Sequence, residues 1–234
     1  PMLKIIFDLR NSFTIFQNKD DQKSLQSNGH SIDDQSIIIM GSGVDHRYYT
    51  PAKEKPISPC IVLGARMLID KGIREYVDAA RIVKKDYPNI RFNLLGFKNV
   101  NNRTAISEKK IYQWQKEGII NYLDPVEDVR PYLNQSDCVI LPSYREGISK
   151  SLLEAAAMER PIICSNVPGC KEIVEDGING IICEPKNFTS LANAIFKIIN
   201  ICYTAIKTHI SIKYQYIMIS CKAVSYTHLR AHET

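Results

Sequence analysis

Two glutamates stand eight positions apart in the stretch SYREGISKSLLEAAA, which covers residues 143–157. Glu146 lies beside Gly147 in a loop-like segment, and Glu154 lies in a segment with the composition of a helix. A carboxylate accepts two hydrogen bonds, so it suits two neighbouring hydroxyls such as those of a ribose. The pair could hold one ligand. The alternative is an ordinary charged helix entry, with Glu146 as a cap and Glu154 on the surface.

Two cations form a second candidate pair. Arg66 and Lys71 follow an apolar run that ends at Gly64, and Asp70 is the acid beside them. Two cations and the amides of a helix N-terminus suit a diphosphate, because hydrogen bonds to charged groups contribute roughly 1.5–3 kcal/mol each. A solvated helix start is the alternative for this pair. The sequence contains no D-x-D triplet, dinucleotide fingerprint or Walker P-loop.

Short apolar runs alternate with segments of helical spacing from residue 60 onward. Apolar strands with helical crossovers predict an α/β fold, in which a Rossmann-like parallel six-stranded sheet carries helices on both faces. Helices are predicted over 105–118, 127–136 and 168–176, among others. The predicted strands are 60–64, 91–96, 119–123, 137–142, 161–165 and 179–183.

Three chemically rich stretches follow predicted strands: GARMLIDKG, SYREGISKSLLEA and VPGCKE. Parallel strands end at one edge of the sheet, where such folds bind ligands, so we expect the three stretches to converge. Glu154 then suits a ribose, the cations suit a diphosphate, and Glu146 suits a second sugar. The predicted ligand is a nucleoside diphosphate sugar.

The charge distribution and the cysteines argue against a nucleic-acid-binding, a secreted or a metal-binding protein. Residues 201–234 carry +3 of the net charge of +5, and the remaining +2 argues against a nucleic-acid surface. No apolar run approaches 18 residues and no secretory pattern opens the chain, so an intracellular protein is expected. The seven cysteines form no C-x-x-C pair. They are expected in the core of a protein from a reducing compartment, and no metal site is predicted.

The segments ARMLIDKG, ILPSYREGISKSLLEAAAMERPIICSNVPGCKEIVEDGINGIICEP and GSGVD resemble the C-terminal half of retaining glycosyltransferases of family 4, which have the GT-B fold. The resemblance runs from about residue 36 to residue 200. It implies hexose transfer from a nucleotide sugar to an acceptor hydroxyl, with retention and without metal or cofactor. UDP-linked donors and surface-glycan or lipid-linked acceptors are implied, as is a front-face substitution in which the departing phosphate helps to deprotonate the acceptor.

The resemblance also implies a role for each candidate residue. Glu146, Arg66 and Lys71 are the implied catalytic residues. Glu146 contacts the donor sugar, Glu154 binds the ribose, and backbone near YLDPVED holds the base. Glu159 stands where relatives usually carry Gly. The implied donor-binding set is Arg66, Lys71, Asp124, Val126, Glu146, Gly147, Ile148, Ser149 and Glu154.

The same resemblance divides the chain. The chain opens on Pro1, which indicates missing upstream sequence, so we expect it to bind donor without turnover. Acceptor binding is expected from the missing domain, and the intact enzyme is expected in the cytoplasm, with peripheral contact at the inner membrane face. The alternative is a non-catalytic nucleotide-sugar-binding module that works with a partner chain; the upstream DNA would distinguish them. The expected divisions are 1–35, an acceptor-domain remnant; 36–59, a linker; 60–200, the nucleotide-sugar-binding domain; and 201–234, an irregular non-native tail.

Overall fold

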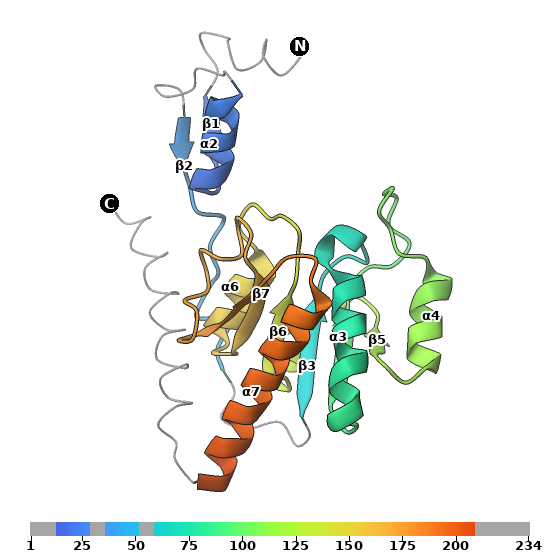
Figure 1. The fold of residues 1–234 in the computed structure, drawn as a ribbon. Helices are drawn as coiled ribbons and strands as arrows, with labels where there is room; N and C mark the ends of the chain where they lie inside the picture. Colours follow the sequence, from blue (N-terminus) through green and yellow to red (C-terminus); the bar gives the residue numbers. More distant parts are fainter. Residues whose placement is uncertain (1–12, 29–35, 52–58, 209–234) are drawn as a thin grey trace.

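The computed structural model describes residues 13–28, 36–51 and 59–208 (Figure 1). A small N-terminal unit precedes a larger α/β domain. The unit contains β1 (Thr14–Phe16), α2 (Lys19–Ser27) and β2 (Ser36–Ile38). The domain contains β3 (Cys60–Gly64), the 3₁₀ helix η2 (Ile69–Lys71), α3 (Ile73–Asp86), β4 (Arg91–Leu95), α4 (Glu108–Lys116), β5 (Asn121–Leu123), α5 (Arg130–Asn134), β6 (Cys138–Leu141), α6 (Lys150–Ala157), β7 (Ile162–Ser165), β8 (Gly180–Cys183) and α7 (Phe188–Thr208).

The six strands of the domain form one parallel sheet in the order β5-β4-β3-β6-β7-β8. The predicted parallel six-stranded sheet is therefore confirmed. The chain builds outward from β3 through β4 to β5, then returns to the other side of β3 and continues through β6. The strand order reverses between β3 and β6, and crevices at such reversals hold the ligands of open α/β sheets.

Helices cover both faces of this sheet, as predicted. Along β3, Ile61 and Leu63 face the core formed with α3, α4 and α7, whereas Val62 faces the core formed with α5 and α6. Figure 1 shows α3 and α7 side by side across one face. Strands buried on both faces require continuous apolar runs, which is why the strand segments carry little alternation of polarity. Five cysteines are buried in the domain, as expected: Cys60, Cys138, Cys164, Cys170 and Cys183.

The N-terminal unit pairs residues on either side of the predicted boundary at residue 36. β1 and β2 are parallel, with Ile15 opposite Ile37, so the predicted linker begins with a strand. α7 continues past residue 200, the predicted end of the nucleotide-sugar-binding domain. Of the expected divisions, residues 1–12 of the acceptor-domain remnant and the tail from residue 209 onward lie outside the described residues.

The predicted helix over residues 168–176 is wrong. The segment forms successive turns, because Gly169 adopts a φ of +80°, which a right-handed helix excludes. The side chain of Asn179 then donates to the carbonyl of Ile173 at 3.0 Å, where a continuing helix would use a backbone amide. Glu159, which stands where relatives usually have Gly, takes a φ of +54° that glycine adopts more readily.

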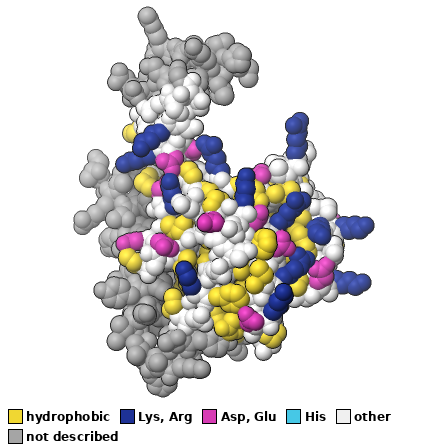
Figure 2. Space-filling model, in the orientation of Figure 1, with side chains coloured by type: hydrophobic (Ala, Val, Ile, Leu, Met, Phe, Trp, Pro, Cys, Tyr) yellow, Lys and Arg dark blue, Asp and Glu magenta, His cyan; other side chains and the backbone are white. Residues whose placement is uncertain are grey.

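The described surface carries charges of both signs. Figure 2 shows basic and acidic side chains intermixed on the face that α3 and α7 cover. Some are paired: the Arg81 guanidinium lies 2.6 Å from Asp78 and 2.7 Å from Glu117. Among the helices in the described ranges, none combines the length and the apolar character that crossing a membrane requires.

Candidate functional site

The three stretches that follow β3, β6 and β7 meet at one edge of the sheet. Lys71 Nζ, after β3, lies 2.5 Å from Glu146 Oε1, after β6. The Tyr144 amide donates to the Asp70 carbonyl at 2.8 Å and joins the same two loops. From the third stretch, the Pro168 carbonyl accepts from the Glu146 amide at 3.2 Å. The loop that carries Glu146 is therefore held from both sides.

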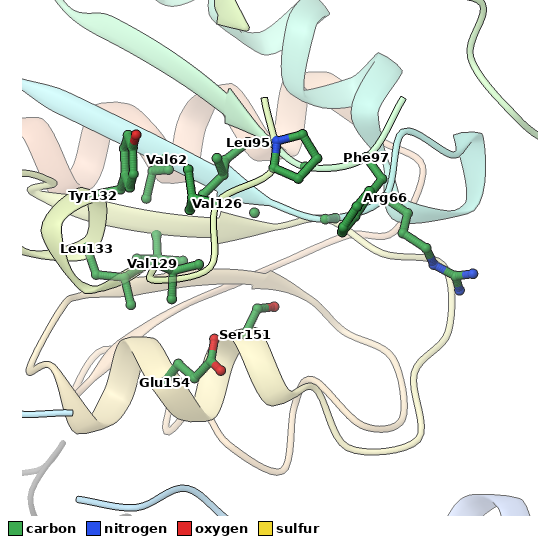
Figure 3. Close-up of a pocket in the computed structure, with 15 residues that line it drawn as sticks. Val62, Arg66, Leu95, Phe97, Val126, Val129, Tyr132, Leu133, Ser151 and Glu154 are labelled. Carbon is green, nitrogen blue, oxygen red and sulfur yellow. The ribbon is translucent and has the colours of Figure 1, made fainter. Parts of the chain in front are cut away.

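A cavity of about 240 Å³ opens beside these loops, at the carboxyl ends of β3 and β4. Figure 3 shows its apolar end, where Val126, Val129 and Leu133 lie near Val62 and Leu95. On the opposite wall, Ser151 and Glu154 project from α6 toward the cavity, while Arg66 extends at the far end beside Phe97. The full lining is Val62, Gly64, Ala65, Arg66, Leu95, Gly96, Phe97, Pro125, Val126, Val129, Tyr132, Leu133, Val139, Ser151 and Glu154.

Glu154 is fixed by a residue that lies 105 positions earlier in the chain. The Tyr49 hydroxyl donates to Glu154 Oε1 at 2.7 Å, and Lys150 Nζ lies 3.8 Å from the same oxygen. Burial, reinforced by this hydrogen bond, raises the pKa of Tyr49, so its hydroxyl keeps its proton near neutral pH. Oε2 takes no hydrogen bond from the described residues. Tyr49 thus orients the carboxylate and leaves one oxygen available to a ligand.

The start of α6 supplies backbone donors. The Ser149 side chain caps the helix by accepting from the Leu152 amide at 3.4 Å. The amides of Lys150 and Ser151 have no hydrogen-bond partner among the residues that the structure describes. Free amides at a helix N-terminus bind anions, and the helix dipole adds to the effect.

Two residues of the predicted donor-binding set, Ile148 and Ser149, have backbone amides that already donate hydrogen bonds within the protein. The Ile148 amide donates to Gln17 Oε1 at 3.0 Å, and the Ser149 amide donates to the Gly169 carbonyl at 3.0 Å. The Gly147 amide takes no partner from the described part of the chain. The donors available to an anion at this loop therefore lie at Gly147 and at the first turn of α6.

The segment YLDPVED contributes to the cavity through Pro125 and Val126. Asp124, which the prediction grouped with Val126, has a side chain that is 73% exposed and lies 3.4 Å from Lys98 Nζ. The cavity lining does not include it. The structure thus places Val126, Arg66 and Glu154 together in the cavity wall, with Lys71 and Glu146 in the adjoining loops.

Several residues at the site are absent from the predicted donor-binding set. Ser151, Phe97 and Tyr132 line the cavity, and Tyr49 and Gln17 contact it or its loop from distant parts of the chain. Ser151 could have been found from its place three residues before Glu154, one helical turn away. Tyr49 and Gln17 depend on long-range contacts that no spacing rule indicates.

The groups that could meet an anion are two cations, the Gly147 amide and the α6 amides. Arg66 supplies a guanidinium and Lys71 an ammonium, while Glu146 and Glu154 supply carboxylates for hydroxyls. Within residues 13–28, 36–51 and 59–208, no group of three or more His, Cys, Asp or Glu is arranged to hold a metal ion. The set suits a ligand that combines negative charge with several hydroxyls.

Residues 58–200 match the family model described as "Glycosyl transferases group 1". The N,N'-diacetylbacillosaminyl-diphospho-undecaprenol alpha-1,3-N-acetylgalactosaminyltransferase of Campylobacter jejuni is 27% identical over 207 residues, which cover 83% of this chain and 52% of the relative. The capsular polysaccharide biosynthesis glycosyltransferase CapM of Staphylococcus aureus is 29% identical over 180 residues, 71% of this chain and 47% of CapM. The chain thus spans about half the length of these relatives.

Solved structures match the fold over most of the chain. Anabaena HepE in complex with UDP superposes with a TM-score of 0.75 at 20% identity, covering 93% of this chain and 59% of HepE. TarM superposes with a TM-score of 0.77 at 16% identity, covering 98% of this chain and 44% of TarM. At these identities the similarity concerns the fold, which is that of the GT-B glycosyltransferases.

Proposed function

Since this chain belongs to the glycosyl transferases group 1 family, we propose that it binds a UDP-linked sugar at the cavity and loops described above. Its role is that of the donor half of a hexosyltransferase. One observation carries this proposal: a single cavity combines an apolar end, the Glu154 carboxylate and the Arg66 guanidinium. Solved structures of the same fold were determined with UDP and with UDP-glucose, which supports the choice of nucleotide.

The nucleoside occupies the cavity itself. A planar base fits the apolar end between Val126 and Leu133, where the cavity lining carries few polar groups. The ribose then lies against α6, where Oε2 of Glu154 accepts from its hydroxyls. Tyr49 keeps Oε1 engaged and so fixes the direction of the carboxylate. This arrangement orders the ligand with its phosphates toward Arg66.

The diphosphate lies between the cavity and the loops. We assign the neutralisation of its charge to Arg66, Lys71 and the free amides of Lys150 and Ser151. When the bond to the sugar breaks, negative charge grows on the departing phosphate, and donors already aimed at it lower the barrier. We therefore propose a metal-independent departure in which these cations and amides stabilise the leaving group.

Glu146 takes the hexose. In the structure its carboxylate pairs with Lys71, and both side chains are largely buried. Donor binding exchanges this pair: Lys71 turns to the diphosphate and Glu146 accepts from sugar hydroxyls. For the reaction we propose retention by front-face substitution. The acceptor oxygen bonds to the anomeric carbon as the phosphate leaves on the same face, and a phosphate oxygen takes the acceptor proton.

The acceptor binds outside the cavity and loops that hold the donor. The similar C. jejuni enzyme is named for transfer to a diphospho-undecaprenol acceptor, and CapM is named for capsular polysaccharide synthesis. We propose an acceptor of this class, a lipid-linked or surface glycan, reached in the cytoplasm at the inner membrane face. This chain alone binds donor without turnover, and a transfer rate within about tenfold of a full-length relative would contradict that.

Calorimetric titration tests the donor class. The chain is titrated with UDP, UDP-GlcNAc, UDP-GalNAc, UDP-Gal and GDP-mannose, each with and without EDTA. UDP and at least one UDP-sugar are expected to bind with unchanged affinity in EDTA, because Arg66, Lys71 and amides hold the diphosphate. Tighter binding of GDP-mannose than of any UDP-ligand would refute the uridine assignment, and loss of binding in EDTA would refute metal independence.

A further inference from the structure

The peptide group between Gly147 and Ile148 is held at both ends by the N-terminal unit. The Ile148 amide donates to Gln17 Oε1 at 3.0 Å, and the Gly147 carbonyl accepts from Asn18 Nδ2 at 3.0 Å. These partners are about 130 positions away in the chain. Two adjacent carboxamides thus fix the orientation of one peptide plane, immediately after Glu146.

Gly147 is shaped for this contact. A Cβ atom on Gly147 would lie 1.9 Å from Gln17 Oε1, far inside van der Waals contact. Any side chain at position 147 would therefore displace the Gln17 carboxamide. The absence of a side chain here permits the close approach of the N-terminal unit, in addition to any approach of a ligand.

Asn18 is itself rigidly placed. Only 1% of the residue is exposed, and its Oδ1 accepts from the Asp21 amide at 2.7 Å as the N-cap of α2. Its Nδ2 also donates to Asp21 Oδ2 at 2.9 Å. Two ion pairs join the first turn of α2 to the domain: Asp21 with Arg145, and Asp20 with Lys171 at 2.6 Å.

We propose that Gln17 and Asn18 are positioning residues for hexose recognition: they fix the Gly147–Ile148 peptide and thereby hold Glu146 where the donor sugar binds. The inference rests on the proposed function. On its other side Glu146 is tied through its amide to Pro168 and through its carboxylate to Lys71. Loss of the Gln17 and Asn18 contacts removes both hydrogen bonds that fix the Gly147–Ile148 peptide. A recognition group displaced by as little as an ångström loses much of its effect.

Gln17→Met and Asn18→Ser test the inference. Met has the shape of Gln without its acceptor, and Ser retains an N-cap for α2 but is too short to reach the Gly147 carbonyl. Each variant is expected to weaken UDP-sugar binding by about three- to tenfold, the usual effect of one hydrogen bond, while UDP affinity stays within about twofold. Gln17→Glu keeps the acceptor oxygen and is expected to bind both ligands as the parent chain does.

Lys171→Ala is the matched control, because it removes an ion pair from the same interface without touching the loop backbone. It is expected to leave the affinities for UDP and for UDP-sugar unchanged.

Equal losses of UDP and UDP-sugar affinity in Gln17→Met and Asn18→Ser would show general destabilisation and overturn the inference. Unchanged affinities in these two variants would overturn it as well. A gain in UDP-sugar affinity in Gln17→Met would also overturn the inference. It would mean that Gln17 occupies the Ile148 amide and keeps it from the ligand. Failure of the parent chain to bind either ligand would refute the proposed function, and the inference with it.

Discussion

Glu154→Ala is expected to weaken UDP and every UDP-sugar alike, by roughly 10- to 150-fold, because a charged acceptor of ribose hydroxyls is removed. The ribose is common to all these ligands, so the loss should not depend on the sugar. Calorimetric titration of the variant with UDP and UDP-GlcNAc measures both affinities.

Glu154→Gln separates charge from geometry. The Gln carbonyl can still accept from Tyr49, which holds Glu154 at 2.7 Å, but the side chain no longer offers two charged acceptor atoms. An intermediate loss is expected. Glu117→Ala is the matched control, because that carboxylate pairs with Arg81 at the end of α4, away from the cavity. If the UDP affinity and the melting temperature of Glu154→Ala were both unchanged, the proposal that Glu154 binds the nucleoside would be wrong.

Glu146→Ala is expected to separate the two ligand classes. UDP-sugar affinity should fall by roughly 10- to 150-fold, since sugar hydroxyls lose a charged acceptor. UDP affinity should stay the same or rise, because Lys71 loses the partner that lies 2.5 Å away and becomes free for the diphosphate. The quantity to measure is the ratio of UDP-sugar affinity to UDP affinity in variant and parent.

Lys71→Ala is the companion variant for this prediction. It removes the cation instead of the carboxylate, so it is expected to weaken UDP and UDP-sugars together. Equal losses of UDP and UDP-sugar affinity in Glu146→Ala would contradict the separate roles of the two glutamates. They would indicate that Glu146 only keeps the loop in place.

Much of the scaffold follows from local sequence. The apolar runs around Val62, Ile140 and Ile163 predict buried parallel strands, because a sheet covered on both faces leaves them no polar side. Parallel strands bring their ends to one edge, so the meeting of Lys71 with Glu146 also follows from element order. The segment after β7 has the composition of a helix, but Gly169 adopts a positive φ and the segment forms turns instead.

The finer geometry of the site depends on contacts between distant residues. Tyr49 reaches Glu154 across 105 positions, and Gln17 reaches Ile148 across 131. Neither residue belongs to a periodic pattern, and both lie before the sheet begins. The position of the Asp124 side chain is likewise not predictable from local sequence. Its neighbours Pro125 and Val126 line the cavity, whereas Asp124 itself pairs with Lys98.

Amide hydrogen exchange of the chain with and without saturating UDP tests the central claim most directly. The proposed nucleotide site lies between the ends of β3 and β4, the segment before α5 and the first turn of α6. Slower exchange is therefore predicted in the cavity segments 62–66, 95–97 and 125–133 and in 150–154. Protection that is confined to other segments would contradict the assignment of this edge as the donor site. A lack of any protection, while calorimetry shows that UDP is bound, would contradict it too.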